Sequence, residues 1–240
     1  MRIKRMKKML RKKAGYYQSS RTLAFGLISM LPLLLGYEYL TLAATREHIL
    51  QVRNGADVIL RALLSAVGVH SPFYFGIGLV VAIGAAVLLR RKGTRLRVNY
   101  FFYAIVESAV YALILALALT TVTDYIMLSM GEERSFHASL MLALGAGVYE
   151  EIVFRLFLYG GMVLVLTNLT RLPMPFIYLG CAVLSSAVFS AAHYMGHEVF
   201  TWYTAVFRFL AGLLFCLIYH FRGLGIAGWS HALYDFFLIL

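Results

Sequence analysis

Residues 138–169 read ASLMLALGAGVYEEIVFRLFLYGGMVLVLTNL. The run is apolar almost throughout, yet its middle holds two adjacent carboxylates, Glu150 and Glu151, and one guanidinium, Arg155. A helix that crosses a bilayer needs about 20 predominantly apolar residues, so the run predicts a transmembrane helix. A charged side chain at the centre of a bilayer costs about 3 kcal/mol or more. Three charges in one span therefore indicate either chemistry or a buried network of ion pairs.

The composition of the whole chain is that of a membrane protein. Of its 240 residues, 61% are hydrophobic and 14% are charged, and the mean hydropathy is +0.78. Soluble domains average about 45–50% apolar and about 25% charged residues. The chain has only 4 prolines and no Ser/Gly-rich tract, so we expect one integral domain. The predicted fold class is all-α, a polytopic membrane helix bundle of about seven to eight transmembrane helices.

Seven apolar runs are long enough to be considered as spans. A shorter helix is expected at Ala56–Val69, where Asp57 and Arg61 lie four residues apart on one face, as in an interfacial or partly buried helix. The Gly160–Gly161 pair leaves open a break in the fourth span, with 156–169 as a separate element. The predicted spans are roughly Leu23–Leu42, Phe73–Leu89, Val98–Thr121, Phe136–Leu158, Met174–His193, Phe200–Phe221 and Gly225–Leu240.

The positive charges are clustered beside the apolar runs. The net charge is +11, and nine of the 22 Lys and Arg residues fall in positions 1–21, with five more in positions 90–97. This distribution follows the positive-inside rule and suits anionic lipid headgroups, so we expect membrane lipids and not nucleic acid as partners. Together with Arg171 and Arg222, it predicts a cytoplasmic N-terminus. The compact size and short loops favour a prokaryotic plasma (inner) membrane.

Helical geometry separates the two glutamates of the fourth span. Residues four apart share a face of an α-helix, whereas neighbours point about 100° apart. Glu151 and Arg155 are therefore expected to form an ion pair, with the acid N-terminal to the base. Glu150 is expected to point elsewhere and to be available to a cavity. The alternative is a purely structural cluster of charges that ties helices together.

Two later spans carry further polar groups. The stretch FSAAH ends at His193, and the stretch HALYD places His231 and Asp235 four residues apart on one face. A glutamate can act as general base on water, and histidines can stabilise an oxyanion or bind a metal that activates water. Counted along straight spans, Glu150 and His231 match in depth, whereas His193 comes out near the outer surface. Together these groups predict a hydrolase.

The three stretches EEIVFR, FSAAH and HALYD follow the patterns E-E-x-x-x-R, F-x-x-x-H and H-x-x-x-[N/D] in order. In this, the chain from Phe136 to Leu240 resembles the CPBP family of intramembrane proteases, which includes the type II CAAX prenyl endopeptidases and bacteriocin-processing proteins. The resemblance implies a catalytic helical core at 136–240, preceded by a basic tail and three spans at 1–135. It also implies a membrane-associated protein or peptide as the substrate.

The resemblance assigns a role to each motif residue. It implies that Glu150 activates the attacking water, that Glu151 and Arg155 support it, and that His193, His231 and Asp235 complete the site. The family often has Asn at the last position, and a carboxylate cannot donate a hydrogen bond unless it is protonated. The resemblance allows a metal-free reaction, which we favour, or one divalent metal such as zinc bound by Glu150, His193, His231 and Asp235.

Other polar residues of the predicted spans leave alternatives open. The resemblance makes Arg208 in the sixth span a candidate for binding a substrate carboxylate. Alternatively, Glu107, Asp124 and Arg208 pair with one another or face a cavity. The second hypothesis for the whole chain is a non-catalytic membrane protein, either a transporter or proton-relay bundle, or an inactive protease fold that serves as a scaffold or in immunity.

Overall fold

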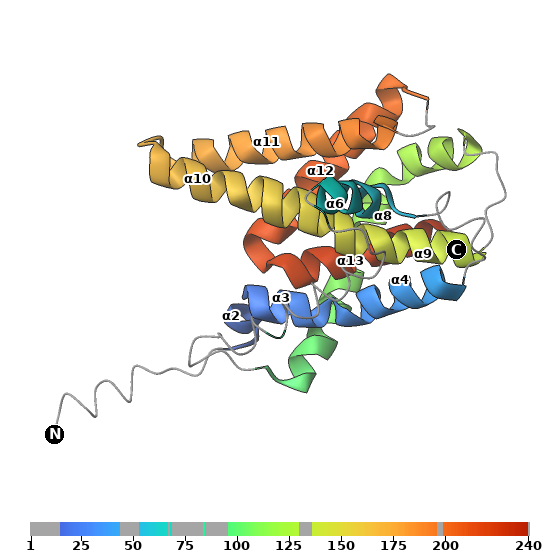
Figure 1. Ribbon diagram of the computed structural model, residues 1–240, viewed down its shortest axis with the longest axis horizontal. Helices are drawn as coiled ribbons and strands as arrows, with labels where there is room; N and C mark the ends of the chain where they lie inside the picture. Colours follow the sequence, from blue (N-terminus) through green and yellow to red (C-terminus); the bar gives the residue numbers. More distant parts are fainter. Residues whose placement is uncertain are drawn as a thin grey trace.

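The structure is a computed structural model, and it describes residues 15–43, 53–66, 68, 84, 96–129, 136–195 and 199–239. Within these ranges the regular elements are helices, most of which run along the long axis of the molecule (Figure 1). In chain order they are α2 (Tyr16–Ser20), α3 (Leu23–Ser29), α4 (Leu31–Ala43), α6 (Gly55–Ala66), α8 (Val98–Ser129), α9 (Phe136–Gly145), η1 (Ala146–Gly160), α10 (Gly161–Leu169), α11 (Met174–Ala192), η2 (His193–Met195), α12 (Trp202–Arg222) and α13 (Leu224–Ile239).

The described ranges confirm an all-α membrane helix bundle. They contain five helical stretches that are long and apolar enough to cross a membrane: Leu23–Ala43, Val98–Leu119, Phe136–Leu169, Met174–Met195 and Trp202–Arg222. The last predicted span forms α13, which has 16 residues and is shorter than these five. The predicted span Phe73–Leu89 lies outside the described residues except for Gly84.

The first span is divided into α3 and α4 at Met30. Pro32, the second residue of α4, has no N–H and cannot continue the hydrogen-bond ladder of α3. A proline is tolerated in the first turn of a helix, so a second helix begins there. The predicted single span is therefore formed by two consecutive helices.

The fourth span is longer than predicted. It runs without a break from Phe136 to Leu169, and Gly160 and Gly161 both keep helical dihedral angles, with φ/ψ of −64°/−40° and −63°/−47°. The separate element that the two glycines suggested does not form, because glycine accepts the helical conformation as well as others. Its middle part, η1, is a π-helix, whose turns are wider than those of an α-helix.

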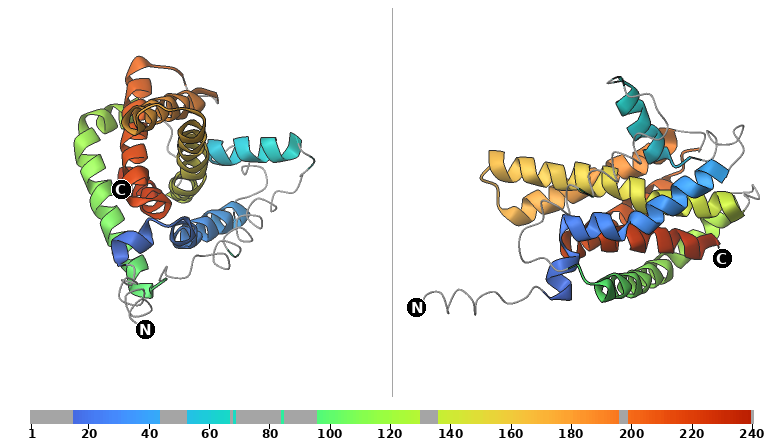
Figure 2. Two further views of the ribbon diagram at one scale, coloured as in Figure 1. Left: turned by 90° about the vertical axis from the view of Figure 1, so that its left-hand side faces the viewer. Right: turned by 60° about the horizontal axis from the view of Figure 1, so that its bottom comes forward.

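Helix α13 lies at the centre of the bundle. It packs against α8, η1, α9, α12 and α3, and Figure 2 shows these helices around it in the view along the long axis. Close approach of η1 to α13 depends on Gly147. A Cβ atom at Gly147 would lie 2.5 Å from the carbonyl oxygen of Gly228 and 2.7 Å from Cβ of Ala232.

This contact gives the first prediction. Replacing Gly147 by Ala should destabilise the protein by about 1–3 kcal/mol, because the added methyl group meets the backbone of Gly228, which cannot move aside easily. Gly161→Ala is the matched control, since a Cβ there meets nothing within 4 Å and alanine favours helix by up to about 1 kcal/mol. Thermal unfolding of the purified protein in detergent measures both. Equal unfolding temperatures for the two variants would contradict the account of this packing.

A partly buried ion pair holds one end of the bundle together. The Arg222 guanidinium contacts both carboxylate oxygens of Glu107, and Tyr16 donates a further hydrogen bond to Glu107. Burial, and the hydrogen bond to Glu107, raise the pKa of Tyr16 above its ordinary value, so this phenol remains a donor. The suggested pairing of Glu107 with Arg208 is wrong, because α8 and α12 run in opposite directions and Glu107 lies beside the end of α12 (Figure 1). The side chain of Asp124 lies outside the described residues.

Helix α6 runs across the long helices (Figure 2). It corresponds to the helix expected at Ala56–Val69, and it extends from Gly55 to Ala66. Its anchor is Asp57, which is fully buried. The Asp57 carboxylate accepts hydrogen bonds from Arg53 at 2.7 Å, Arg61 at 2.6 Å and Tyr37 at 2.8 Å. Asp57 and Arg61 lie on one face of α6, as their spacing predicted, and they form an ion pair. Through Tyr37 the Asp57 carboxylate fixes α6 to α4.

Candidate active site

The π-helix η1 brings both glutamates toward α13. Glu151 Oε1 lies 2.7 Å from Nδ1 of His231, and Glu150 Oε2 lies 3.8 Å from Nε2 of the same ring. The two carboxylates therefore approach opposite nitrogens of one imidazole ring, and of the two only Glu151 forms the ion pair with Arg155. The expectation that Glu150 is available for chemistry stays a prediction.

His231 is the centre of this cluster. Its Nδ1 faces Glu151, and because the carboxylate Oε1 carries no proton to donate when ionised, Nδ1 donates the hydrogen bond. Its Nε2 lies 3.8 Å from Glu150 Oε2 and 3.8 Å from Asp235 Oδ2. Both of these separations are too long for a direct hydrogen bond, and both are short enough for one small group to bridge them.

Arg155 and Glu151 form the ion pair that their spacing predicted. Arg155 Nη1 lies 3.0 Å from Glu151 Oε1, and both side chains are fully buried. The guanidinium also packs over the rings of Phe189 at 4.3 Å and Phe215 at 5.2 Å, measured to the ring centroids. Phe215 in turn stacks on His231, with centroids 4.2 Å apart. The ion pair and the two rings thus fix the position of the imidazole.

His193 lies level with Glu150 along the bundle, whereas counting along straight spans had placed the two at different depths. Glu150 lies 19 residues before Leu169, the end of α10, and His193 lies 19 residues after Met174, the start of α11. Because α10 and α11 form a hairpin (Figure 1), the two positions lie side by side, and Glu150 and His193 interact electrostatically. The predicted depth was wrong because the fourth span ends at Leu169 and not at Leu158.

One ring nitrogen of His193 is held by the backbone. Its Nδ1 lies 2.8 Å from the carbonyl oxygen of Phe189, which can only accept, so Nδ1 carries the proton. In the neutral ring Nε2 is then a hydrogen-bond acceptor. The Phe189 ring also packs edge-on against both His193 and His231, and it thereby connects the second and third motifs.

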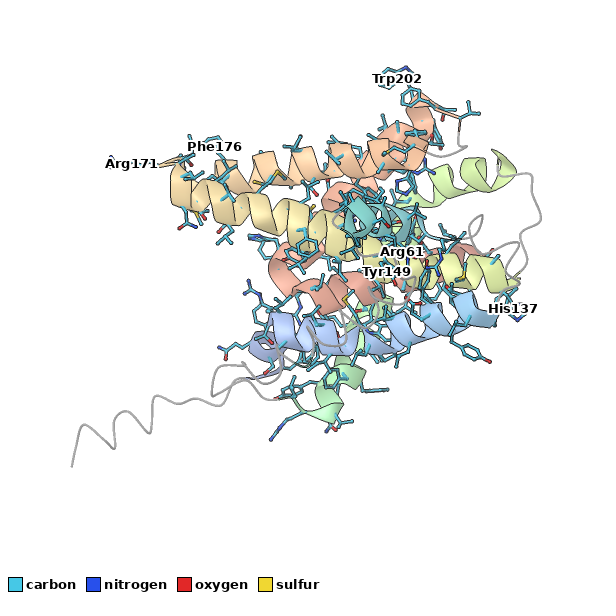
Figure 3. All side chains as sticks on the ribbon, in the orientation of Figure 1. Arg61, His137, Tyr149, Arg171, Phe176 and Trp202 are labelled. Carbon is cyan, nitrogen blue, oxygen red and sulfur yellow. The ribbon has the colours of Figure 1, made fainter. Side chains whose placement is uncertain are left out.

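A side chain that the motifs did not predict completes the cluster. The Asn54 amide nitrogen donates a 2.8 Å hydrogen bond to Glu150 Oε1. The preceding residue of η1, Tyr149, donates to Glu38, which also contacts Arg61 of α6; Arg61 and Tyr149 are labelled close together in the view of Figure 3. The segment around α6 therefore contacts η1 directly at the candidate site.

The second oxygen of Glu150 has a different environment. Among the described residues, no group is within hydrogen-bonding distance of the buried atom Glu150 Oε2. A buried carboxylate oxygen without a partner costs free energy, about 1–3 kcal/mol or more for a charged group. Such an exception requires an explanation, and a catalytic role is one. Glu151 Oε2 also has no partner among the described residues, but Glu151 is already bound to Arg155 and His231, so we take Glu150 Oε2 as the candidate proton acceptor of the cluster.

The side chains do not form a metal centre in this arrangement. Glu150, His193, His231 and Asp235 were the candidate ligands, yet across the described ranges no group of three or more His, Cys, Asp and Glu side chains is arranged to hold a metal ion. Zinc requires three or four ligands at about 2.0–2.3 Å. The 3.8 Å separations of His231 Nε2 from Glu150 Oε2 and Asp235 Oδ2 leave room for one bridging group, so the metal-free reaction that we favour stays a prediction.

The remaining candidate, Arg208, lies near the cluster but outside it. Its guanidinium is 5.3 Å from the centroid of the Tyr194 ring, and Tyr194 is the residue that follows His193. The Tyr194 hydroxyl shares a 2.6 Å hydrogen bond with Thr204. This position is compatible with contact to a substrate that extends beyond His193, and it leaves the substrate-carboxylate role of Arg208 a prediction.

A cavity of about 410 Å³ lies at the other end of η1. Aromatic and aliphatic side chains form much of its wall, including Leu156, Tyr159 and Tyr219. His220 also lines it and shares a 2.8 Å hydrogen bond with the Tyr159 hydroxyl. The cavity reaches Gly223, which precedes His231 by eight residues, roughly 12 Å along a helix. It is therefore distinct from the cluster around His231.

Comparison with known protein families gives a match to the later part of the chain. Residues 132–237 match the model of a family described as Rce1-like, type II CAAX prenyl endopeptidase Rce1-like. The match includes every motif residue of the cluster, from Glu150 to Asp235, and does not include Asn54. No curated protein and no solved structure matches the chain.

Proposed function

Residues 132–237 belong to the Rce1-like family of type II CAAX prenyl endopeptidases, and from this premise we propose that the chain is an intramembrane endopeptidase that hydrolyses a peptide bond with water activated by Glu150. The observation that supports this most strongly is the buried Glu150 Oε2, which lacks a hydrogen-bond partner among the described residues and faces His231 Nε2 at 3.8 Å. Hydrolysis of a peptide bond requires a base that takes a proton from the attacking water, and the Glu150 carboxylate can serve as this base.

The first step is attack by water. A water molecule between Glu150 and His193 donates one hydrogen to Glu150 Oε2 and the other to His193 Nε2, which is an acceptor because Nδ1 donates to Phe189. As its oxygen forms a bond to the carbonyl carbon, the proton moves to Glu150. Such general-base catalysis contributes about 10²–10⁴-fold in rate.

The second step is collapse of the tetrahedral intermediate. His231, protonated on both nitrogens, donates through Nδ1 to Glu151 and through Nε2 to the negative oxygen of the intermediate. Glu150 then transfers its proton to the leaving nitrogen, and the carbon–nitrogen bond breaks. One water is consumed, one carboxyl group and one amine are formed, and Glu150 returns to its carboxylate form.

The remaining motif residues hold this arrangement. Glu151 is bound by both His231 and Arg155, so it fixes the imidazole and neutralises the buried guanidinium. Asp235, 3.8 Å from His231 Nε2, stabilises the positive charge of the imidazolium. We place the apolar part of the substrate in the cavity beside η1, whose wall has the matching chemistry.

A cleavage assay tests the proposal. The purified protein in liposomes is incubated with three peptides: one ending in a prenylated Cys-a-a-X sequence, the same peptide without the prenyl group, and an unrelated transmembrane peptide. Mass spectrometry should detect cleavage of at least one, and the family description makes the prenylated peptide the first candidate. A wild-type chain that cleaves none of them, nor any protein of a native membrane extract, would favour the non-catalytic alternative.

The role of Asp235 gives a separate prediction. Asp235→Asn should retain cleavage within about tenfold of wild type, because the amide keeps the size of the side chain and can donate to the oxyanion. Asp235→Ala, which removes both possibilities, should lose about 10–100-fold, as is common when a positioning partner is removed. Initial rates for the two variants in the same liposomes give the comparison. An inactive Asp235→Asn would show instead that the negative charge itself is required.

A further inference from the structure

Asn54 stands immediately before α6, outside the matched family region, and its side chain reaches the proposed general base. It is 5% exposed and is separated from Glu150 by 96 positions in the chain. We propose that Asn54 is a positioning residue for the reaction: it holds Glu150 so that Oε1 is occupied and Oε2 is the oxygen that receives the proton. This inference rests on the proposed function.

The direction of the Asn54 amide follows from its second hydrogen bond. Its Oδ1 accepts a 2.9 Å hydrogen bond from the backbone N–H of Ala56, and this N–H can only donate. The oxygen of the amide must therefore face Ala56, and the NH₂ group must face Glu150. An amide NH₂ has no acceptor capacity, so Glu150 Oε1 is the acceptor in the 2.8 Å contact. The contact is a charge-assisted hydrogen bond when Glu150 is ionised.

This hydrogen bond makes the two oxygens of Glu150 inequivalent. Oε1 is bound to Asn54, whereas Oε2 faces His231 Nε2 at 3.8 Å and has no hydrogen-bond partner within the part of the chain described. A carboxylate without such a tether can rotate about its terminal torsion, which is broad and two-fold. Fixing that rotation reduces the entropy that must be lost before proton transfer.

Two further contacts hold Asn54 itself. Its backbone N–H donates to the Tyr37 hydroxyl at 3.4 Å, and that hydroxyl donates to Asp57 at 2.8 Å. The start of η1 confines it as well, because a Cβ atom at Gly145 would lie 2.9 Å from Cβ of Asn54. A residue held in this way can impose a position on Glu150.

The experiment separates this role from the structural role of Asn54 at the start of α6. Asn54→Ser keeps a side-chain oxygen that can accept from the first turn of the helix, but it is too short to reach Glu150. Asn54→Asp keeps the size and the acceptor and replaces the donor by a negative charge that faces Glu150. Ser65→Ala, at an exposed position of α6, is the control for substitution in this helix.

We expect Asn54→Ser to unfold at the wild-type temperature and to lose about 10–100-fold in kcat with KM within about twofold, since the interaction helps the reaction and not substrate binding. Asn54→Asp should lose more because of charge repulsion, and Ser65→Ala should equal wild type. A wild-type kcat for Asn54→Ser, with Glu150→Gln inactive, would overturn this inference alone. An active Glu150→Gln would overturn the proposed function and this inference with it.

Discussion

Replacing Glu150 by Gln should reduce the rate of peptide cleavage by about 10²–10⁴-fold, the range that a general base contributes. The amide has nearly the shape of the carboxylate, and its oxygen can still accept from Asn54, so the fold should be unaffected. The amide cannot take a proton from water, so the loss should appear in kcat. Initial rates in liposomes, together with the unfolding temperature in detergent, measure the two effects separately.

Glu38→Gln is the matched control for this substitution. Glu38 accepts a 2.7 Å hydrogen bond from Tyr149, the neighbour of Glu150, and is not in contact with His231 among the described interactions. Glutamine can accept the same hydrogen bond, so this variant should cleave within about threefold of wild type. Full proteolysis by Glu150→Gln, or an equal loss in both variants, would contradict the assignment of Glu150 as the base.

The second large effect is expected on stability. Arg155→Met should destabilise the fold by about 3–5 kcal/mol, because it removes one partner of a fully buried ion pair and leaves the Glu151 charge uncompensated. The double variant Glu151→Gln with Arg155→Met removes both charges and should be closer to wild type in stability, since well-packed apolar groups often replace a buried ion pair at little cost.

Unfolding in denaturant, followed in detergent micelles, gives the three free energies needed for this comparison. The double variant should fold and still cleave poorly, because His231 loses the charged partner of its Nδ1. Losses of stability that simply add in the double variant would show that Arg155 contributes through its packing on Phe189 and Phe215, and not through Glu151.

Much of the fold follows from apolar runs and helical spacing. The long apolar stretches predicted the spans because each must satisfy its backbone hydrogen bonds internally within the bilayer. The ion pair Glu151–Arg155 and the shared face of Asp57 and Arg61 were predicted because residues four apart lie on one side of a helix. The three motifs predicted which side chains matter, since each buried charge has its own cost.

The convergence of the two glutamates required the structure. An α-helical projection separates Glu150 from Glu151, and no local pattern in the residues around them indicates the wider turns of η1. The depth of His193 depended on where the fourth span ends, and helix ends are poorly defined by composition within a continuous apolar run. Both points depend on local geometry, which the choice of residues does not determine.

Asn54 and the partner of Glu107 were missed for another reason. Asn54 stands before Gly55 and Asp57, a pattern typical of a helix start, and nothing in it indicates a contact 96 positions away. Glu107 pairs with Arg222 across 115 positions. Contacts of this kind depend on how the helices pack against one another, and the spacing of residues along the sequence does not determine that packing.

Cleavage in water enriched in oxygen-18, under single-turnover conditions with enzyme in excess over peptide, tests the central claim most directly. If Glu150 activates water, the new carboxyl group of the product should carry one heavy oxygen, and the peptide that contains Glu150, recovered from the digested enzyme, should carry none. Label in Glu150 would instead indicate that its carboxylate attacks the substrate and forms an anhydride that water then opens. That result, or an unlabelled product, would contradict direct attack by a water molecule that Glu150 activates.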